Sequence, residues 1–254
     1  MFAGRDEEPD AGEQGQVAAR PVEDVVRRAP QRAVFPRSSI IEGMSDTRTT
    51  ERIGVYSDYV CPFCYLGRQS LSQYQNDREA ELEIDWHPFD LRSGERNPDG
   101  SIDHSADDGK DEDYYEQARE NVQRLQEEYD TEMSLEPAME VDSLPAQVAS
   151  YYVKETSSYE QWLEFDVAIF EALWQDERDI GDHDVLAELA RDADLDPDEI
   201  RDVLGDDEWR SEVEEQSTAA QRQGVTGVPT FTYGEYAARG AVPPEHLQRL
   251  VEGT

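Results

Sequence analysis

The sequence contains few cysteines, few basic side chains and no long hydrophobic run. A structural metal site needs four ligands, and two cysteines with four histidines supply none at zinc spacing. No hydrophobic stretch approaches the length of a transmembrane helix, and no charged segment followed by an apolar one opens the chain. These absences predict a protein without metal ligands or membrane segments. We expect it to work in the cytoplasm, where thiols are more often catalytic than structural.

Positive charge is scarce, because 23 basic residues face 60 acidic ones and only Lys110 and Lys154 are lysines. The net charge of −37 argues against binding to nucleic acid or to an anionic membrane surface. The acidic residues are spread along stretches with clear hydrophobic periodicity, which disfavours a disordered acidic chain. This combination is typical of a cytoplasmic protein from a halophile.

Residues 1–43 differ from the rest of the chain. They carry six arginines against eight acidic residues, are rich in proline, glycine, alanine and glutamine, and show no helical or strand period. We interpret this segment as disordered or as a mis-assigned N-terminal extension, with Met44 as the natural start.

From residue 53 onward the hydrophobic spacing predicts ordered elements. A β-leaning run at 53–56, a helix at 62–78 and an alternating strand at 82–87 form a βαβ unit. A polar loop follows at 92–112, and the next stretches have helical periodicity or helix-start signals. They lie at about 115–129, 144–152, 162–174, 182–189, from 196, and at 207–223. A hairpin at 228–233 and 236–239 and a final helix from 243 complete the order.

The two cysteines lie in Cys61-Pro62-Phe63-Cys64, where the first strand gives way to a helix. Pro62 suits the first helical position, because its fixed φ fits there and its missing N–H would be unpaired anyway. Cys61 then lies among the free N–H groups of the helix N-terminus, which favours the nucleophilic thiolate. Cys64 falls on the buried side, within reach of a mixed disulfide on Cys61. The pattern predicts a redox dithiol.

Three other interpretations of the cysteine pair remain: ligands of a structural metal, a fixed structural disulfide, or two unrelated buried cysteines. The metal lacks further ligands, and a disulfide across two residues closes too small a loop to constrain the unfolded chain. The position between a strand and a helix therefore favours redox chemistry.

The order of elements and several short stretches resemble a known family. The stretches are Ser-Asp-Tyr-Val-Cys-Pro-Phe-Cys-Tyr at 57–65, His-Pro-Phe-Asp-Leu at 87–91, Asp-Ile-Gly-Asp at 179–182, Gly-Val-Thr-Gly-Val-Pro-Thr-Phe at 224–231 and Gly-Ala-Val-Pro-Pro at 240–244. Over roughly residues 52–252 the chain resembles the DsbA family, and within it the FrnE-type branch of cytoplasmic dithiol–disulfide oxidoreductases. The resemblance implies an α/β thioredoxin fold (βαβ…ββα) with a large all-helical insertion. We expect a first thioredoxin part at 44–91, a loop and helical insertion domain at 92–206, and a second thioredoxin part at 207–254.

The resemblance also implies the site. Cys61 and Cys64 would be catalytic, and Val228–Pro229 would be a cis peptide beside them, with an ordinary trans proline at a strand start as the alternative. Val228 would offer backbone groups to an extended substrate, and Pro229, Pro62 and Phe63 would complete the substrate-binding residues. The implied partners are protein disulfides or thiols and an unidentified thiol reductant or oxidant. No cofactor is implied.

Two positions depart from the wider fold. Thioredoxin-like enzymes often carry a buried acid six residues before the nucleophile, where this chain has Val55, so that Cys64 lacks an obvious proton acceptor. Asp58 is nearer in sequence, and we interpret it as a loop or capping residue. Strongly oxidising members place a histidine between the cysteines, whereas Pro62-Phe63 resembles the pair found in glutaredoxins.

Two other functions remain open. The glutathione-transferase-kappa and hydroxychromene-carboxylate isomerase relatives share the fold and use a thiol cofactor, but they usually replace the first cysteine or lose the second. A chaperone-like binding module would use the helical insertion as its surface. Retention of both cysteines favours a thiol–disulfide oxidoreductase or isomerase acting on protein disulfides.

Overall fold

The computed structural model describes residues 27–28, 50–97, 100–103, 105–106, 109–135 and 141–253. These residues contain a five-stranded mixed sheet of order β1-β5-β4-β2-β3, in which β2 and β3 are parallel and the other neighbours are antiparallel. The strands are β1 (Arg27–Arg28), β2 (Glu51–Ser57), β3 (Leu82–Pro88), β4 (Thr230–Tyr233) and β5 (Tyr236–Arg239). The βαβ unit and the late hairpin thus share one sheet, which confirms the predicted thioredoxin fold.

The parallel pair β2–β3 supplies the centre of the core. Ile53 lies opposite Ile84 and Val55 opposite Trp86, and all four side chains are buried. Along β3, buried and half-buried residues alternate, as the sequence pattern predicted. Because the two strands are parallel, the segments that follow residues 57 and 88 leave the sheet at the same edge.

The helices have clear local start signals. The N-caps Asp182, Asp196 and Asp206 each accept a hydrogen bond from the backbone N–H two residues further on. The described residues form α1 (Pro62–Asp77), α2 (Glu112–Glu128), α3 (Leu144–Thr156), α4 (Tyr159–Trp174), α5 (His183–Asp192), α6 (Pro197–Leu204), α7 (Asp207–Arg222) and α8 (Pro244–Glu252).

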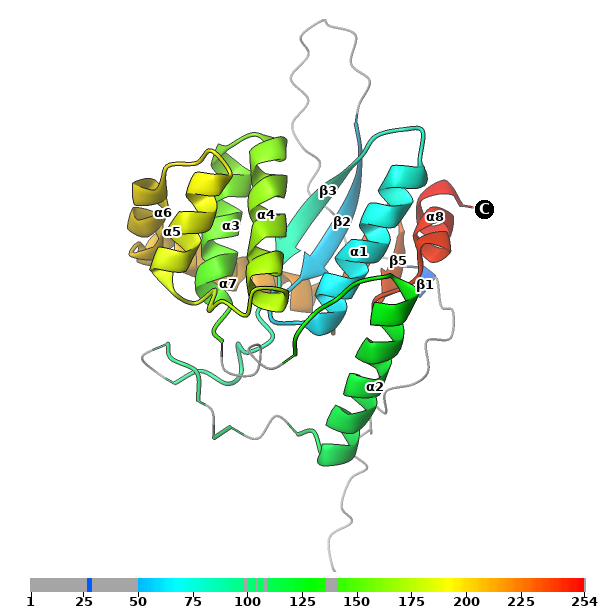
Figure 1. The fold of residues 1–254 in the computed structure, drawn as a ribbon, viewed down its shortest axis with the longest axis horizontal. Helices are drawn as coiled ribbons and strands as arrows, with labels where there is room; N and C mark the ends of the chain where they lie inside the picture. The colour runs from blue at the N-terminus through cyan, green and yellow to red at the C-terminus, as the bar shows by residue number, and fades with distance from the viewer. Residues whose placement is uncertain are drawn as a thin grey trace, which may run out of the picture.

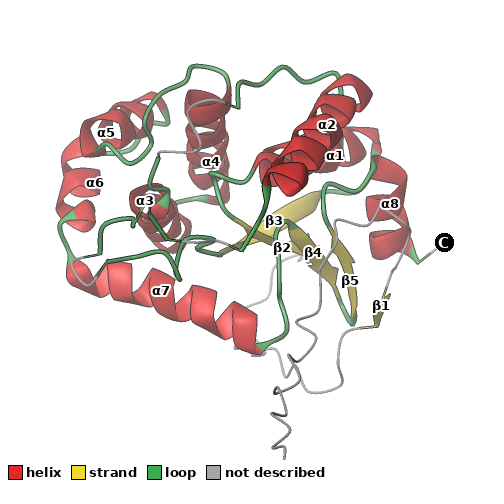
Figure 2. Ribbon diagram, turned by 90° about the horizontal axis from the view of Figure 1, so that it is seen from below, coloured by secondary structure: helices red, strands yellow, loops and turns green. Residues whose placement is uncertain are grey.

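The helices form two groups around the sheet. Helices α1 and α8 pack together beside the strands, and α3 to α6 form a separate bundle on the β3 side (Figures 1 and 2). Helix α7 contacts both α3 and β3, so it connects the bundle to the sheet. Helix α2 extends away from this body and packs on α1, through a cluster that contains Leu66, Val122 and Leu125 (Figure 1).

The structure describes only two residues of the N-terminal segment. Of residues 1–43, the described ones are Arg27 and Arg28, which pair with β5, a pairing that the sequence did not predict. The remainder of the predicted extension and Met44 lie outside the described residues. The division at 44–91, 92–206 and 207–254 stays a prediction. Within the described ranges, every helix is too short or too polar to cross a membrane.

Candidate functional site

The dithiol loop connects β2 to α1. The Cys61 N–H donates to the Asp58 carbonyl oxygen at 3.2 Å, which closes the turn formed by residues 58–61. Cys61 is the N-cap, with extended backbone angles (φ −88°, ψ 114°), and Pro62 is the first helical residue, as predicted. The Cys64 N–H donates to the Cys61 carbonyl oxygen at 3.0 Å. The Cys61 sulfur therefore stands at the positive end of α1.

The two thiols differ in exposure and surroundings. Cys61 is 5% exposed and Cys64 is 0% exposed. The Cys61 thiol points to the Val228 carbonyl oxygen, with the sulfur 3.7 Å from it. Burial raises the pKa of the Cys64 thiol well above its usual value, and the hydrogen bond with the Cys61 sulfur raises it further. Cys61 is therefore the more accessible of the two thiols, and Cys64 lies in the interior.

The loop before β4 faces the dithiol. The Val228–Pro229 peptide bond, for which the resemblance implies the cis form, is cis in the structure. The Pro229 carbonyl oxygen accepts the Gly240 N–H at 2.9 Å, which ties this loop to the end of β5. A Cβ atom at Gly67 would lie 3.1 Å from both the Pro229 ring and the Phe231 ring. Helix α1 can therefore approach the proline loop because Gly67 has no side chain.

The structure brings the predicted site residues together. Val228 contacts Cys61, and Pro62 and Phe63 are half-buried at the start of α1. Phe63 packs against both the main core and the α2 cluster, so its ring links the dithiol helix to α2. Within the described residues, no three or more His, Cys, Asp or Glu side chains are arranged to hold a metal ion.

Asp58 is a loop residue, as predicted, but it is also fully buried. Its carboxylate accepts the backbone N–H groups of Val60 at 3.2 Å and Leu91 at 2.9 Å, and a hydrogen bond from the Ser143 hydroxyl. Burial and the nearby Asp90 charge raise the pKa of Asp58 to about 6, although these three hydrogen bonds oppose the shift. A carboxyl group with a near-neutral pKa therefore lies in the dithiol loop.

Arg96 neutralises the second buried carboxylate of this region. Its Nε donates to Asp90 at 3.0 Å, and its two terminal nitrogens each donate to one oxygen of Asp142 at 2.8 Å. These partners raise the pKa of Arg96 above its usual value. Arg96 thus connects the segment after β3 to the segment before α3, and both segments also contact Asp58.

The helical insertion also holds the dithiol loop, through hydrogen bonds between Tyr59 and residues of α3 and α4. The buried Tyr59 hydroxyl donates to Asp166 on α4 at 2.9 Å and accepts from the Ser150 hydroxyl on α3, which lies 2.7 Å away. The Trp174 indole N–H donates to the Tyr59 carbonyl oxygen at 2.9 Å. Asp166 is also paired with Arg68 on α1, at 2.6 Å. The insertion therefore fixes the loop and the first helix relative to each other.

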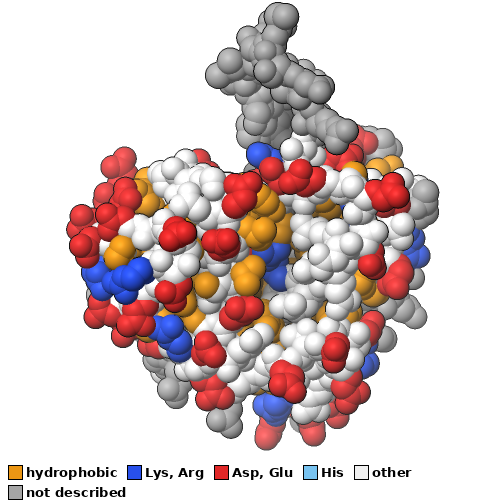
Figure 3. All heavy atoms as spheres, turned by 45° about the horizontal axis from the view of Figure 1, so that its top comes forward, with side chains coloured by type: hydrophobic (Ala, Val, Ile, Leu, Met, Phe, Trp, Pro, Cys, Tyr) orange, Lys and Arg blue, Asp and Glu red, His pale blue; other side chains and the backbone are white. Residues whose placement is uncertain are grey.

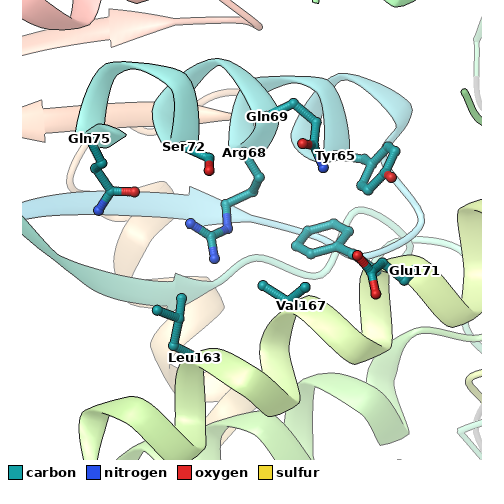
Figure 4. A pocket seen from close by; sticks show the side chains of 9 residues that line it. Tyr65, Arg68, Gln69, Ser72, Gln75, Leu163, Val167 and Glu171 are labelled. Atoms are coloured by element: carbon teal, nitrogen blue, oxygen red, sulfur yellow. The ribbon is translucent and has the colours of Figure 1, made fainter. Parts of the chain in front are cut away.

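A pocket of about 270 Å³ lies between α1 and α4, beyond the dithiol (Figure 4). Tyr65 and Gln75 mark its two ends on α1, and Leu163 and Val167 face them from α4. Arg68 points into it, but its charge is compensated by the fully buried Asp166. On this side of the molecule, hydrophobic and basic side chains lie in a hollow among scattered acidic ones (Figure 3). The two cysteines do not line this pocket, so it is separate from the dithiol.

Several residues around the dithiol were missed from the sequence. Asp90 and Leu91 belong to the stretch 87–91 that carries the family resemblance, and that stretch was the signal in the sequence that could have placed them near the dithiol. Arg96 lies in a segment that we predicted only as a polar loop, and Ser143 directly precedes the helix predicted at 144–152. Ser143 is the N-cap of α3, but its side chain makes no capping hydrogen bond to that helix.

Comparison with known proteins agrees with this geometry. Residues 52–252 match the family described as the DSBA-like thioredoxin domain. The "Uncharacterized protein YwbO" of Bacillus subtilis (strain 168) is 29% identical over 207 residues, which cover 80% of this chain and 96% of that protein.

Two solved structures share the fold at low sequence identity. A "probable DsbA oxidoreductase" from Streptomyces coelicolor has a TM-score of 0.65 and 23% identity, over 80% of this chain and 88% of that one. A 2-hydroxychromene-2-carboxylate isomerase has a TM-score of 0.61 and 20% identity, over 78% of this chain and 92% of that one. Because the family match spans four of the five strands, the dithiol and the helical insertion, this chain belongs to the DSBA-like thioredoxin domain family.

Proposed function

We propose that this protein is a dithiol–disulfide oxidoreductase or isomerase that acts on protein disulfides. The observation that carries the proposal is the pairing of Cys61 at the N-terminus of α1 with the Val228 carbonyl group, while Cys64 is buried behind it. This arrangement gives one thiol access to substrate and reserves the other for an intramolecular step.

The exchange follows from these positions. The Cys61 thiolate attacks one sulfur of a substrate disulfide, a new S–S bond joins Cys61 to the substrate, and the other substrate sulfur leaves as a thiolate. The Cys64 thiolate then attacks the Cys61 sulfur, which forms the Cys61–Cys64 disulfide and releases the second substrate thiolate. The substrate gains two electrons and the dithiol loses two. A thiol reductant returns the enzyme to the dithiol form, or the reverse sequence oxidises a substrate.

We further propose that Val228 and Pro229, with Pro62 and Phe63, form the surface that receives an extended substrate peptide. The half-buried positions of Val228, Pro62 and Phe63 and the contact between the Val228 carbonyl oxygen and the Cys61 sulfur support this assignment, with Pro229 buried behind Val228. The motif resemblance supports the FrnE-type branch, and the acidic composition supports a halophilic host and a cytoplasmic location.

Reduction of insulin by a dithiol donor in high KCl tests the proposal. We expect the wild type to accelerate the reaction, and the Cys61→Ser variant to give only the uncatalysed rate. The Cys64→Ser variant should lose turnover but accumulate mixed disulfides on Cys61, which non-reducing electrophoresis and mass spectrometry would detect.

The same variants separate this proposal from its alternatives. A thiol-cofactor enzyme would keep its activity on a small electrophile in the Cys64→Ser variant. A chaperone-like module would suppress aggregation of an unfolded protein equally well without either cysteine. If neither insulin reduction nor any mixed disulfide is observed with the wild type, the proposed function is wrong.

A further inference from the structure

The resolving step requires that the buried Cys64 thiol lose a proton. The thiolate is the nucleophile, and Cys64 is 0% exposed, so bulk water does not take the proton directly from its sulfur. The neighbouring Cys61 is engaged in the mixed disulfide at this stage. An internal acceptor is therefore needed for the Cys64 proton.

Asp58 lies against the Cys64 sulfur. Its backbone N–H faces that sulfur and favours the thiolate, while its carboxylate is near enough to oppose a second negative charge there. The Asp58 carbonyl oxygen also accepts the Cys61 N–H at 3.2 Å, so the residue is held beside both members of the dithiol. Its carboxylate is fully buried and is held in place by hydrogen bonds from the N–H groups of Val60 and Leu91.

We propose that Asp58 accepts the Cys64 proton when Cys64 resolves the mixed disulfide, and returns it when the enzyme disulfide is reduced. The inference rests on the thiol–disulfide exchange proposed above. In the forward step the Cys64 S–H bond breaks, the proton moves to an Asp58 oxygen directly or through one water, and the Cys64 electron pair forms the bond to Cys61. The substrate sulfur leaves with the electron pair of its former bond to Cys61, so atoms and electrons balance.

The groups around Asp58 suit a base that works near neutral pH. Asp90 faces it from the segment after β3, and Arg96 and Asp142 lie behind Asp90 as an ion-paired cluster. With a pKa of about 6, Asp58 is mainly ionised at pH 7 and still basic enough to take a proton. The hydrogen bonds from Val60 and Leu91 also hold the loop, but burial beside the Asp90 carboxylate raises the pKa of Asp58 toward the value that suits a general base near neutral pH.

The resolving step can be measured with a small aromatic disulfide, 5,5′-dithiobis(2-nitrobenzoate), on the full chain in high KCl. Stopped-flow absorbance should show two phases, one equivalent of released thiolate from the attack by Cys61 and a second from resolution by Cys64. In the wild type, the rate of the second phase should rise with pH and show an inflection near 6. In the Asp58→Asn variant we expect this phase to slow by about 10²-fold at pH 7 and to lose the inflection, whereas the first phase changes by less than about twofold.

The matched control is Asp90→Asn, which removes the neighbouring buried carboxylate but keeps the acceptor. It should retain a fast second phase and move the inflection to lower pH, because the Asp90 charge helps to raise the pKa of Asp58. A purely structural role for Asp58 would not produce such a shift.

The assignment is overturned if Asp58→Asn resolves at the wild-type rate with the wild-type pH profile. It is also overturned if the wild type shows no inflection between pH 5 and 7, a result that does not depend on whether the variant folds. If the wild type releases only one equivalent of aromatic thiolate, Cys64 does not resolve the mixed disulfide and the role proposed for Asp58 is wrong. Because the assay uses a small disulfide, failure to reduce insulin would refute the proposed substrate class and leave the role of Asp58 standing.

Discussion

Replacement of Asp58 by asparagine should also change how stability depends on pH. The pKa of Asp58 is about 6 in the folded protein and 3.8 for an ordinary aspartate. A carboxyl group whose pKa is raised by folding contributes stability that is complete below the unfolded pKa and is lost as the pH rises through the folded pKa. The total loss corresponds to about 3 kcal/mol, of which about 1.4 kcal/mol falls between pH 5 and pH 7.5.

Asparagine does not titrate, so the variant lacks this loss. The asparagine side chain leaves at least one of the Val60 and Leu91 N–H groups without a carboxylate oxygen. The lost hydrogen bond lowers the free energy of unfolding of the variant by an amount that does not depend on pH. The free energy of unfolding of the variant minus that of the wild type should therefore increase by about 1.4 kcal/mol between pH 5 and pH 7.5.

Urea unfolding at fixed high KCl concentration measures this difference, because urea leaves the ionic strength unchanged. The lower pH limit keeps both proteins above the isoelectric point of about 4.2. A difference that stays constant within about 0.5 kcal/mol, or that decreases with pH, would show that the buried carboxyl is not destabilised by folding and would refute the reasoning.

Other perturbations test other parts of the structure. Arg96→Met should lower the free energy of unfolding by about 3–5 kcal/mol in urea, because it leaves the buried Asp90 unpaired; a loss below about 1 kcal/mol would contradict this. Gly67→Val should displace Pro229 and slow the reduction of insulin by at least about tenfold. In the control Gly94→Val, the added Cβ atom has no neighbour within 4 Å, so the rate should not change, and equal rates for the two variants would disprove the packing argument. The melting temperature should rise between about 0.1 M and 2 M KCl as the net charge of −37 is screened, and a flat profile would remove the halophile argument. The dithiol should have a reduction potential in the glutaredoxin range of about −200 to −230 mV, and a value above about −150 mV in a redox titration would favour an oxidase instead.

Local signals in the sequence predicted the elements of this protein well. Pro62 at the first turn of α1 and Asp196 before Pro197 at the start of α6 act through hydrogen bonds and backbone angles within one turn. The alternation along β3 likewise reflects one strand with its two faces. Such signals depend on residues a few positions apart, and for this reason they can be read without knowledge of the fold.

The environment of the dithiol could not be predicted in this way. Asp58 and Arg96 are ordinary polar residues of loops in the sequence, and the partners that determine their charge states come from distant segments. Arg96 meets Asp142 across 46 positions, and Arg68 meets Asp166 across 98. Whether a carboxyl group is buried, and which cation or second carboxylate faces it, depends on how the insertion packs on the sheet.

The sequence by itself therefore determined the order of elements, the family and the two cysteines at the N-terminus of a helix. The tertiary structure decided that Asp58 is fully buried within electrostatic reach of Cys64, and that Arg96 pairs with Asp90 and Asp142. The physical reason is that helix starts and strand faces arise from interactions along a few residues. Desolvation and charge pairing, which control the reactivity of the dithiol, arise only when remote segments exclude water from the same small volume.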